Sequence, residues 1–208
     1  MRIDDILARA TVMPVLEIAE LDSAAPLATA LLDGGVDVIE LTMRTDCALE
    51  ALRAAKATQP DMVIGMGTIR TPNDVEEALA AGADFLVSPG AGPALLDALA
   101  QSGAPALPGV ATASEAMAAS EAGFDAMKLF PAEAVGGVAL LKSLAGPLPN
   151  LRFCPTGGVS AELAPTYLAL PNVACVGGSW IATRQMIADG DFETIRKNAE
   201  RAAAMGAG

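Results

Sequence analysis

The sequence of 208 residues contains no histidine, and this absence removes several kinds of catalytic chemistry. A Ser-His triad, a Cys-His pair and most zinc or non-haem iron sites depend on imidazole. Acid–base chemistry near neutral pH must therefore use glutamate, aspartate, lysine, cysteine, tyrosine or the substrate itself.

Basic residues are also scarce, with 13 Lys and Arg against 25 Asp and Glu, so that the net charge is −12. No basic cluster offsets this charge, so we expect neither a nucleic acid partner nor binding to an anionic membrane. A small anionic ligand is still allowed, because its binding depends on local groups.

Long apolar runs and signal-like segments are missing as well. No run is long enough to span a bilayer, and residues 1–7 have no apolar core typical of a signal peptide. The three cysteines, Cys47, Cys154 and Cys175, are odd in number and widely spaced. They read as free thiols in a reducing compartment, which predicts a cytoplasmic protein without a membrane partner.

Aromatic residues make up only 3% of a sequence that is 52% hydrophobic, so small and branched aliphatic side chains must form the core. Short apolar runs alternate with helical patterns, which is typical of a parallel sheet. Eight such strands are expected, at 12–18, 36–42, 62–68, 85–89, 106–110, 126–131, 152–158 and 173–180. Helices are expected at 23–33, 46–58, 72–81, 92–101, 112–122 and 133–145.

Eight strands close a (β/α)8 TIM barrel, so we predict this α/β fold as a single domain over residues 1–208. The residues before 12 predict an extra N-terminal helix, and the tail after about 200 is expected to fray. Ser23, Thr45, Thr71 and Thr112 are expected to cap helices because each precedes a helical pattern.

A weak repeat places two charged residues at equivalent positions. The segments 35–40 (GVDVIE) and 123–128 (GFDAMK) each contain Gly, then Asp, then a strand. Glu40 and Lys128 both lie three residues after the Asp, on the second and sixth strands. Side chains of alternate strands share a layer inside such a barrel, so these two are expected to converge there.

Lys128 is the lysine that the pattern places inside a strand. Lys56, Lys142 and Lys197 lie in amphipathic helices, where solvated lysines belong. The structural alternative is that Lys128 lies at the edge of its strand and extends its ammonium group into water. An apolar surrounding would instead favour the free amine, which attacks ketones to form an imine. Glu40 could then move protons, or could be only a structural ion-pair partner.

Two glycine pairs follow the seventh and eighth strands, in the segments 156–160 (TGGVS) and 177–180 (GGSW). Barrels of this kind often bind phosphate there through backbone N–H groups. Either pair alone could be a tight turn, but the two together predict a phosphorylated ligand.

Other polar residues lie at the predicted strand ends. Arg44 follows the second strand and could bind a carboxylate with its planar guanidinium. Thr68 could help it or could cap the next helix together with Thr71. Glu17 could assist proton transfer or orient other groups, and the sequence leaves it unassigned.

Seven short motifs occur in order along the chain: 40–45 (ELTMRT), 65–68 (GMGT), 88–90 (SPG), 108–109 (PG) with 112–115 (TASE), 128–133 (KLFPAE), 153–159 (FCPTGGV) and 176–180 (VGGSW). Over about residues 4–200 these motifs resemble the KDPG/KHG aldolases, which are class I 2-dehydro-3-deoxy-phosphogluconate aldolases also active on 4-hydroxy-2-oxoglutarate. The resemblance implies that Lys128 forms the Schiff base and that Glu40 accepts and donates the proton. Arg44 and Thr68 would bind the pyruvyl carboxylate, and the carbonyl of Pro89 would line the site.

The resemblance further implies that Thr156 contacts the keto-acid portion, while Gly157, Gly158 and Ser179 hold the phosphate. It implies cleavage of 2-dehydro-3-deoxy-6-phosphogluconate to pyruvate and glyceraldehyde 3-phosphate in the Entner–Doudoroff route. The implied enzyme is a homotrimer that uses no metal and no cofactor.

Two other functions fit the same fold, because fold alone does not determine chemistry. A phosphosugar isomerase or epimerase would use Glu40 as its base, with Lys128 as an electrostatic group. A non-enzymatic sugar-phosphate sensor would bind through the glycine loops and would not need the Lys–Glu pair. A near neighbour among the lyases is an aldolase for the phosphogalactonate substrate, which differs in its stereochemistry at C4.

Overall fold

The computed structural model describes residues 1–206 and has an α/β fold in which strands and helices alternate. The strands are β1 Val12–Leu16, β2 Val38–Thr42, β3 Val63–Gly67, β4 Phe85–Val87, β5 Ala106–Leu107, β6 Gly109–Val110, β7 Ala126–Leu129, β8 Arg152–Pro155 and β9 Val176–Gly178. The α-helices are α1 Ile3–Leu7, α2 Ala24–Asp33, α3 Ala48–Thr58, α4 Pro72–Ala80, α5 Pro93–Ser102, α6 Ala113–Glu121, α7 Gly137–Ala145, α8 Ala164–Leu168, α9 Arg184–Ala188 and α10 Phe192–Ala204. Two short 3-10 helices, η1 Leu21–Ser23 and η2 Glu133–Val135, precede α2 and α7.

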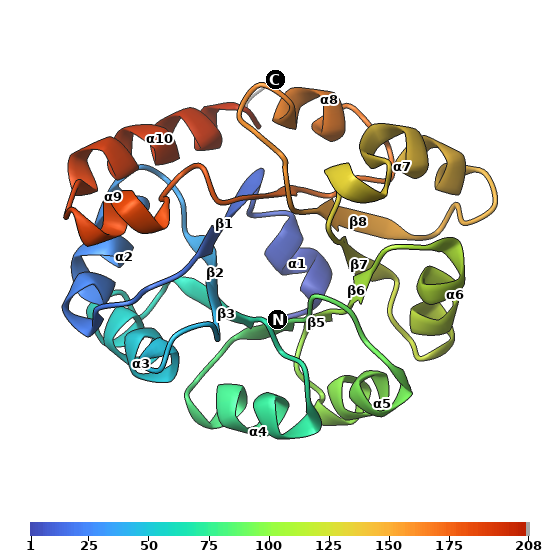
Figure 1. Cartoon of the computed structure of the whole chain (residues 1–208), viewed down its shortest axis with the longest axis horizontal. Helices are drawn as coiled ribbons and strands as arrows, with labels where there is room; N and C mark the ends of the chain where they lie inside the picture. The colour runs from blue at the N-terminus through green and yellow to red at the C-terminus, as the bar shows by residue number, and fades with distance from the viewer. Residues whose placement is uncertain (207–208) are drawn as a thin grey trace.

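All strand pairs are parallel, and they form two sheets. One sheet has the order β5-β4-β3-β2-β1-β9, and the other has the order β6-β7-β8. Isolated parallel bridges, Phe153 to Val173 and Thr156 to Gly177, link the second sheet to the end of the first. In Figure 1 the strands surround the centre of the molecule, α1 lies within that ring, and the other helices lie outside it.

The predicted strand 106–110 is present as two short strands rather than one. Pro108 separates β5 from β6 and has no N–H to contribute to a sheet. β5 pairs with β4, whereas β6 pairs with β7, so the division between the two sheets falls at this proline. The prediction of one continuous strand is therefore wrong at this position.

Side chains alternate between two apolar layers along each strand, as the pleat of a strand requires. In β7, Ala126 packs in an inner cluster, whereas Met127 packs in the outer cluster beneath the helices. In β2, Val38 and Ile39 divide in the same way. The inner cluster also contains Ile6 and Leu7 of α1, both almost fully buried, so α1 covers this end of the interior.

Two of the four expected helix caps are confirmed. The hydroxyl of Thr71 accepts a hydrogen bond from the N–H of Asp74, and Thr112 does the same for α6. Ser23 makes no capping hydrogen bond, and Thr45 instead donates to the carbonyl of Ile18. Both predictions are wrong, and for Thr45 the reason is a tertiary contact that the local pattern does not contain.

The C-terminal segment is more regular than expected, since α10 continues to Ala204 rather than ending near residue 200. Residues 207–208 of the predicted frayed tail lie outside the described residues. Within residues 1–206, no helix is long and apolar enough to cross a membrane.

Candidate active site

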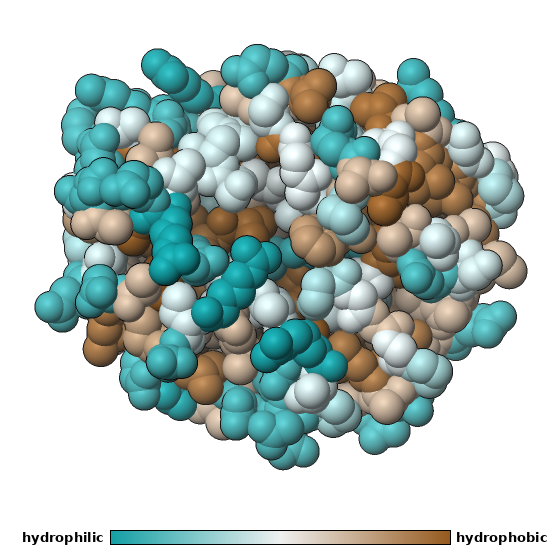
Figure 2. Space-filling model, viewed as in Figure 1, coloured by the Kyte–Doolittle hydropathy of each residue, from teal (hydrophilic) through white to brown (hydrophobic). Residues whose placement is uncertain are grey.

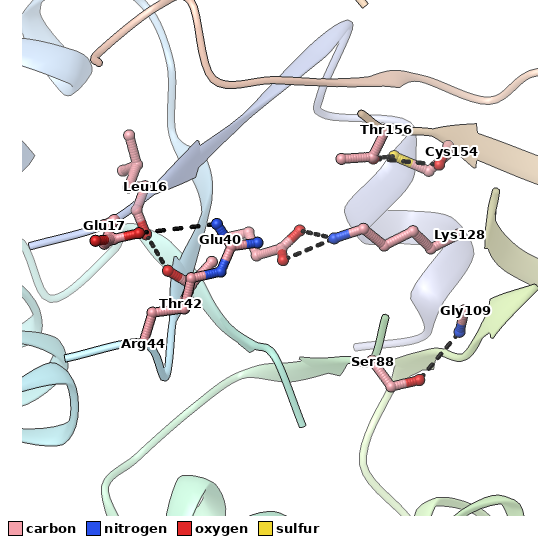
Figure 3. Close-up of polar contacts among 10 residues, drawn as sticks. All are labelled: Leu16, Glu17, Glu40, Thr42, Arg44, Ser88, Gly109, Lys128, Cys154 and Thr156. Atoms are coloured by element: carbon pink, nitrogen blue, oxygen red, sulfur yellow. Dashed lines mark hydrogen bonds and ion pairs between the residues drawn. The ribbon is translucent and has the colours of Figure 1, made fainter. Parts of the chain in front are cut away.

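Lys128 and Glu40 form a buried ion pair at the centre of the strands. Lys128 lies two residues after the inward-facing Ala126, and Glu40 lies two residues after Val38, so both side chains point inward. Lys128 Nζ is 2.9 Å from Glu40 Oε1 and 3.2 Å from Oε2. Figure 3 shows the two side chains extending toward each other from opposite sides. The convergence predicted from the repeat is confirmed.

The pair is almost entirely removed from solvent, with side-chain exposures of 6% for Lys128 and 3% for Glu40. A Cβ atom at Gly67 would overlap the Glu40 carboxylate, so a glycine there leaves the room that the carboxylate occupies. The ring of Phe130 lies 5.4 Å from Lys128 Nζ, a distance at which a ring face attracts a cation. A hydrogen-bonded charge pair enclosed by apolar groups is an arrangement that often marks a functional site.

Two buried thiols lie near the pair. Cys154 is the parallel partner of Lys128 across the sheet. A hydrogen bond from Cys175 and the positive charge of Lys128 lower the pKa of the Cys154 thiol despite its burial. The pKa of Cys175 is raised well above its usual value by that same hydrogen bond and by burial. All three cysteines are free, as expected from the sequence.

A cavity of about 380 Å³ lies beside this pair, and it contains five of the predicted binding residues. It is lined by Arg44, Thr156, Gly157, Gly158 and Ser179, together with residues that the sequence did not single out. Figure 2 shows strongly hydrophilic side chains beside a hollow near the centre of this face. The lining thus combines charged side chains with glycines and hydroxyl groups.

The glycine loop after β8 allows a close approach to the backbone. Gly157 and Gly158 have φ angles of 97° and 81°, in the left-handed region that favours glycine. A Cβ atom at Gly158 would lie 2.8 Å from the side chain of Glu133, and one at Gly177 would overlap Thr156. Glycine is thus needed at both positions. Gly177 and Gly178 lie within β9 rather than in a loop after it, so the prediction of a second glycine loop is wrong.

Thr68 and Pro89 do not line the cavity but lie at neighbouring strand ends. Thr68 has a φ angle of 66°, which is uncommon for a residue with a side chain. Such strain clusters at functional sites. The alternative role for Thr68 as a helix cap is wrong, because Thr71 caps α4.

The carbonyl of Pro89 approaches the strand that neighbours Lys128. A Cβ atom at Gly109 would overlap the carbonyl group of Pro89. Gly109 is in turn the parallel partner of Lys128, and its N–H donates to Ser88 Oγ over 3.0 Å. Ser88 is fully buried. These contacts fix the Pro89 carbonyl at the edge of the Lys128 site.

Glu17 and Arg184 are cavity residues whose roles the sequence did not predict. Glu17 Oε2 lies 3.8 Å from Arg44 Nη1, and Glu17 Oε1 lies 3.1 Å from Arg184 Nη1. Arg184 begins the short helix α9 in a polar stretch, where nothing in the sequence distinguishes it from a solvated arginine.

Within residues 1–206 no group of three or more His, Cys, Asp or Glu side chains could hold a metal ion. The expected absence of a metal stays a prediction, since other ligand sets exist.

Comparison with known proteins places the chain in one family. Residues 3–198 match the family model described as KDPG and KHG aldolase. The chain is 45% identical over 201 residues to a 2-dehydro-3-deoxy-phosphogluconate aldolase of Dickeya dadantii, covering 97% of this chain and 94% of the relative. It is 43% identical over 199 residues to the KHG/KDPG aldolase of Escherichia coli K12, covering 96% and 93%.

A solved structure agrees with this result. The KDPG aldolase of Legionella pneumophila, with pyruvate captured at low pH as a covalent carbinolamine intermediate, is 42% identical to the chain with a TM-score of 0.95. The match covers 97% of this chain and 98% of that one. On this evidence the chain belongs to the KDPG and KHG aldolase family.

Proposed function

We propose that this chain is a class I aldolase that cleaves 2-dehydro-3-deoxy-6-phosphogluconate to pyruvate and glyceraldehyde 3-phosphate. The observation that carries the proposal is the buried Lys128–Glu40 pair beside a cavity lined by Gly157, Gly158 and Ser179. The same chemistry allows 4-hydroxy-2-oxoglutarate, which would give pyruvate and glyoxylate. Both substrates contain the 2-keto acid that an amine attacks.

The distance between the two side chains supports the first step. Lys128 Nζ donates to Glu40 over 2.9 Å, so a proton can pass to the carboxylate and leave a free amine. The amine adds to C2 of the keto acid, and loss of water from the carbinolamine gives an iminium. Glu40 gives the proton that it received from Lys128 to the C2 hydroxyl of the carbinolamine, which then leaves as water.

The iminium then drives the cleavage of the carbon–carbon bond. The C4 hydroxyl gives its proton to Glu40, the C3–C4 bond breaks, and its electron pair moves toward the iminium nitrogen to form an enamine. Protonation of C3 regenerates the iminium, and the addition of one water releases pyruvate and restores Lys128. The water lost during imine formation equals the water consumed during release.

For the remaining site residues we propose roles that match their positions. Arg44 and Thr68 bind the pyruvyl carboxylate, which suits a planar guanidinium. The carbonyl of Pro89 lines the site, and Thr156 contacts the keto-acid portion. The phosphate is held by Gly157, Gly158 and Ser179, and their shared cavity supports this assignment.

We also propose that the two sheets form one (β/α)8 barrel in a single domain over residues 1–208, with β5 and β6 acting as one strand interrupted by Pro108. The bridges from Phe153 and Thr156 to the β9 side support this closure. A cytoplasmic homotrimer without metal or cofactor is part of the same proposal. The free cysteines favour a reducing compartment, and light scattering in solution tests the trimer.

The decisive experiment is mass spectrometry after incubation with pyruvate and borohydride. We expect one pyruvyl adduct that maps to Lys128 and is absent from Lys128→Ala. The exposed Lys142 on α7 provides the matched control, and Lys142→Ala should keep the adduct. If no adduct forms under conditions where the folded protein binds pyruvate or a sugar phosphate, the aldolase assignment is wrong. An isomerase that uses Glu40 as base, or a sensor, would then be favoured.

A further inference from the structure

The cavity contains two basic side chains joined by one acidic side chain. Glu17 lies on the loop after β1 and contacts Arg44 after β2 and Arg184 at the start of α9. All three residues line the cavity that also contains Ser179 and the glycine loop after β8. Figure 3 shows the Glu17 and Arg44 part of this arrangement on the β2 side of the Lys128–Glu40 pair.

The local charge of this trio favours an anion. Two guanidinium groups and one carboxylate give a charge of +1 in a chain whose net charge is −12. Arg44 and Arg184 are the basic residues among those that line the cavity. An acidic protein that attracts a doubly charged phosphate needs such a local reversal of charge.

We infer that Arg184 is a specificity residue for the phosphate of the aldehyde portion, and that Glu17 positions it. This inference rests on the proposed aldolase function and extends it. Ser179 and the backbone N–H groups of Gly157 and Gly158 provide neutral hydrogen-bond donors, whereas Arg184 adds a charged donor. A charged donor stabilises a bound phosphate more than it stabilises the hydroxyl group of an unphosphorylated aldehyde.

Glu17 gives the arginine a defined place at the cavity. The side chain of Arg184 is 68% exposed, so without a partner it would sample many rotamers in solvent. Glu17 is only 22% exposed and uses its second oxygen for Arg44. One carboxylate therefore links the arginine proposed for the pyruvyl end to the arginine proposed for the phosphate end.

The test compares two aldehydes in the synthetic direction, glyceraldehyde 3-phosphate and unphosphorylated glyceraldehyde, each with pyruvate. For Arg184→Gln we expect the ratio of kcat/KM for the phosphorylated over the unphosphorylated aldehyde to fall about tenfold, the value of one charge-assisted hydrogen bond at a solvated site. The advantage of the phosphorylated aldehyde should also become less sensitive to salt. Arg184→Lys should restore part of the ratio, because it keeps the charge but not the planar fork.

Arg201→Gln on the exposed face of α10 is the matched control, since it removes the same charge away from the cavity. An unchanged ratio in Arg184→Gln, or an equal fall in Arg201→Gln, overturns the inference. Trapping of pyruvate on Lys128 is measured in every variant. If the protein without substitutions forms no pyruvate adduct on Lys128, the aldolase function itself is wrong, and the inference about Arg184 is not the part that has failed.

The role of Glu17 is tested by its dependence on Arg184. Glu17→Gln should raise the KM for glyceraldehyde 3-phosphate with little change in kcat, whereas Glu17→Asp should recover part of the loss. In the Arg184→Gln background, Glu17→Gln should have no further effect on the aldehyde ratio. Additive effects of the two substitutions would show that Glu17 does not act through Arg184.

Discussion

Removing Lys128 alone should destabilise the fold strongly, apart from its effect on catalysis. In Lys128→Met the Glu40 carboxylate, 3% exposed, would lose the ammonium that lies 2.9 Å away. An uncompensated buried charge of this kind costs about 3–5 kcal/mol of unfolding free energy. Because domains are stable by only about 5–15 kcal/mol, the loss should be large and easily measured.

Removing both charges should reverse that loss. Replacing a buried ion pair with apolar residues of similar volume is often neutral, or stabilising by about 1–4 kcal/mol. Methionine suits both positions because it is unbranched and adapts to an irregular space. We therefore expect Glu40→Met/Lys128→Met to be about as stable as the original protein, or more stable, although it forms no pyruvate adduct.

Urea unfolding provides the measurement, followed by circular dichroism and by the fluorescence of Trp180, the single tryptophan. The control is Lys197→Met, which removes a lysine that lies 3.2 Å from Glu193 in a pair exposed by 56% and 61%. This exposed pair should contribute little to the free energy of unfolding. The reasoning is refuted if Lys128→Met costs no more than Lys197→Met, or if the double variant is as unstable as the single one.

Two further predictions concern other parts of the site. Gly158→Ala should raise the KM for the phosphorylated substrate, because a φ of 81° and the contact with Glu133 strain any side chain at this position by about 1–3 kcal/mol. Gly146→Ala is the control, since a Cβ atom at Gly146 would meet no other atom within 4 Å. An unchanged KM for Gly158→Ala would exclude a tight phosphate loop at this position. Burial and the hydrogen bond to Glu133 raise the pKa of Tyr167 above its usual value of 10.0. The folded state thus holds this proton more tightly than the unfolded state, so the stabilisation is complete below pH 10 and is lost as the pH rises through the folded pKa. Tyr167 is the single tyrosine, so tyrosinate absorbance reports it alone, and titration at the ordinary value in the folded protein would contradict the prediction.

Local periodicity was sufficient to predict that Glu40 and Lys128 lie together inside the ring of strands. Side chains in strands alternate with a period of two, so the spacing from each Asp predicted that Glu40 and Lys128 share one layer. The loop at Gly157 and Gly158 was predictable from the local sequence as well, since positive φ angles favour glycine. These features depend on residues close together in the sequence. The second pair, Gly177 and Gly178, was not predictable in this way, because it lies within β9.

Contacts between distant segments were less predictable. The Glu17–Arg184 pair joins the first and last parts of the chain, and its partners are chosen by tertiary geometry. Thr45 was expected to cap a helix, but the carbonyl of Ile18 offered it a competing acceptor. The interruption at Pro108 followed from the missing N–H, although its assignment to two sheets depended on which neighbours β5 and β6 meet.

The position of α1 has a consequence for the kinetic order of the proposed reaction. Ile6 and Leu7 pack against the first residues of the strands, such as Val38 and Ala126, so we expect molecules to reach Lys128 from the opposite side, where the cavity lies. The three-carbon fragment bound to the lysine then lies deeper than the aldehyde. In cleavage the aldehyde must depart first, and in synthesis pyruvate must arrive first. Product inhibition should accordingly be competitive for pyruvate and noncompetitive for the aldehyde, the signature of an ordered sequence with a single route in and out.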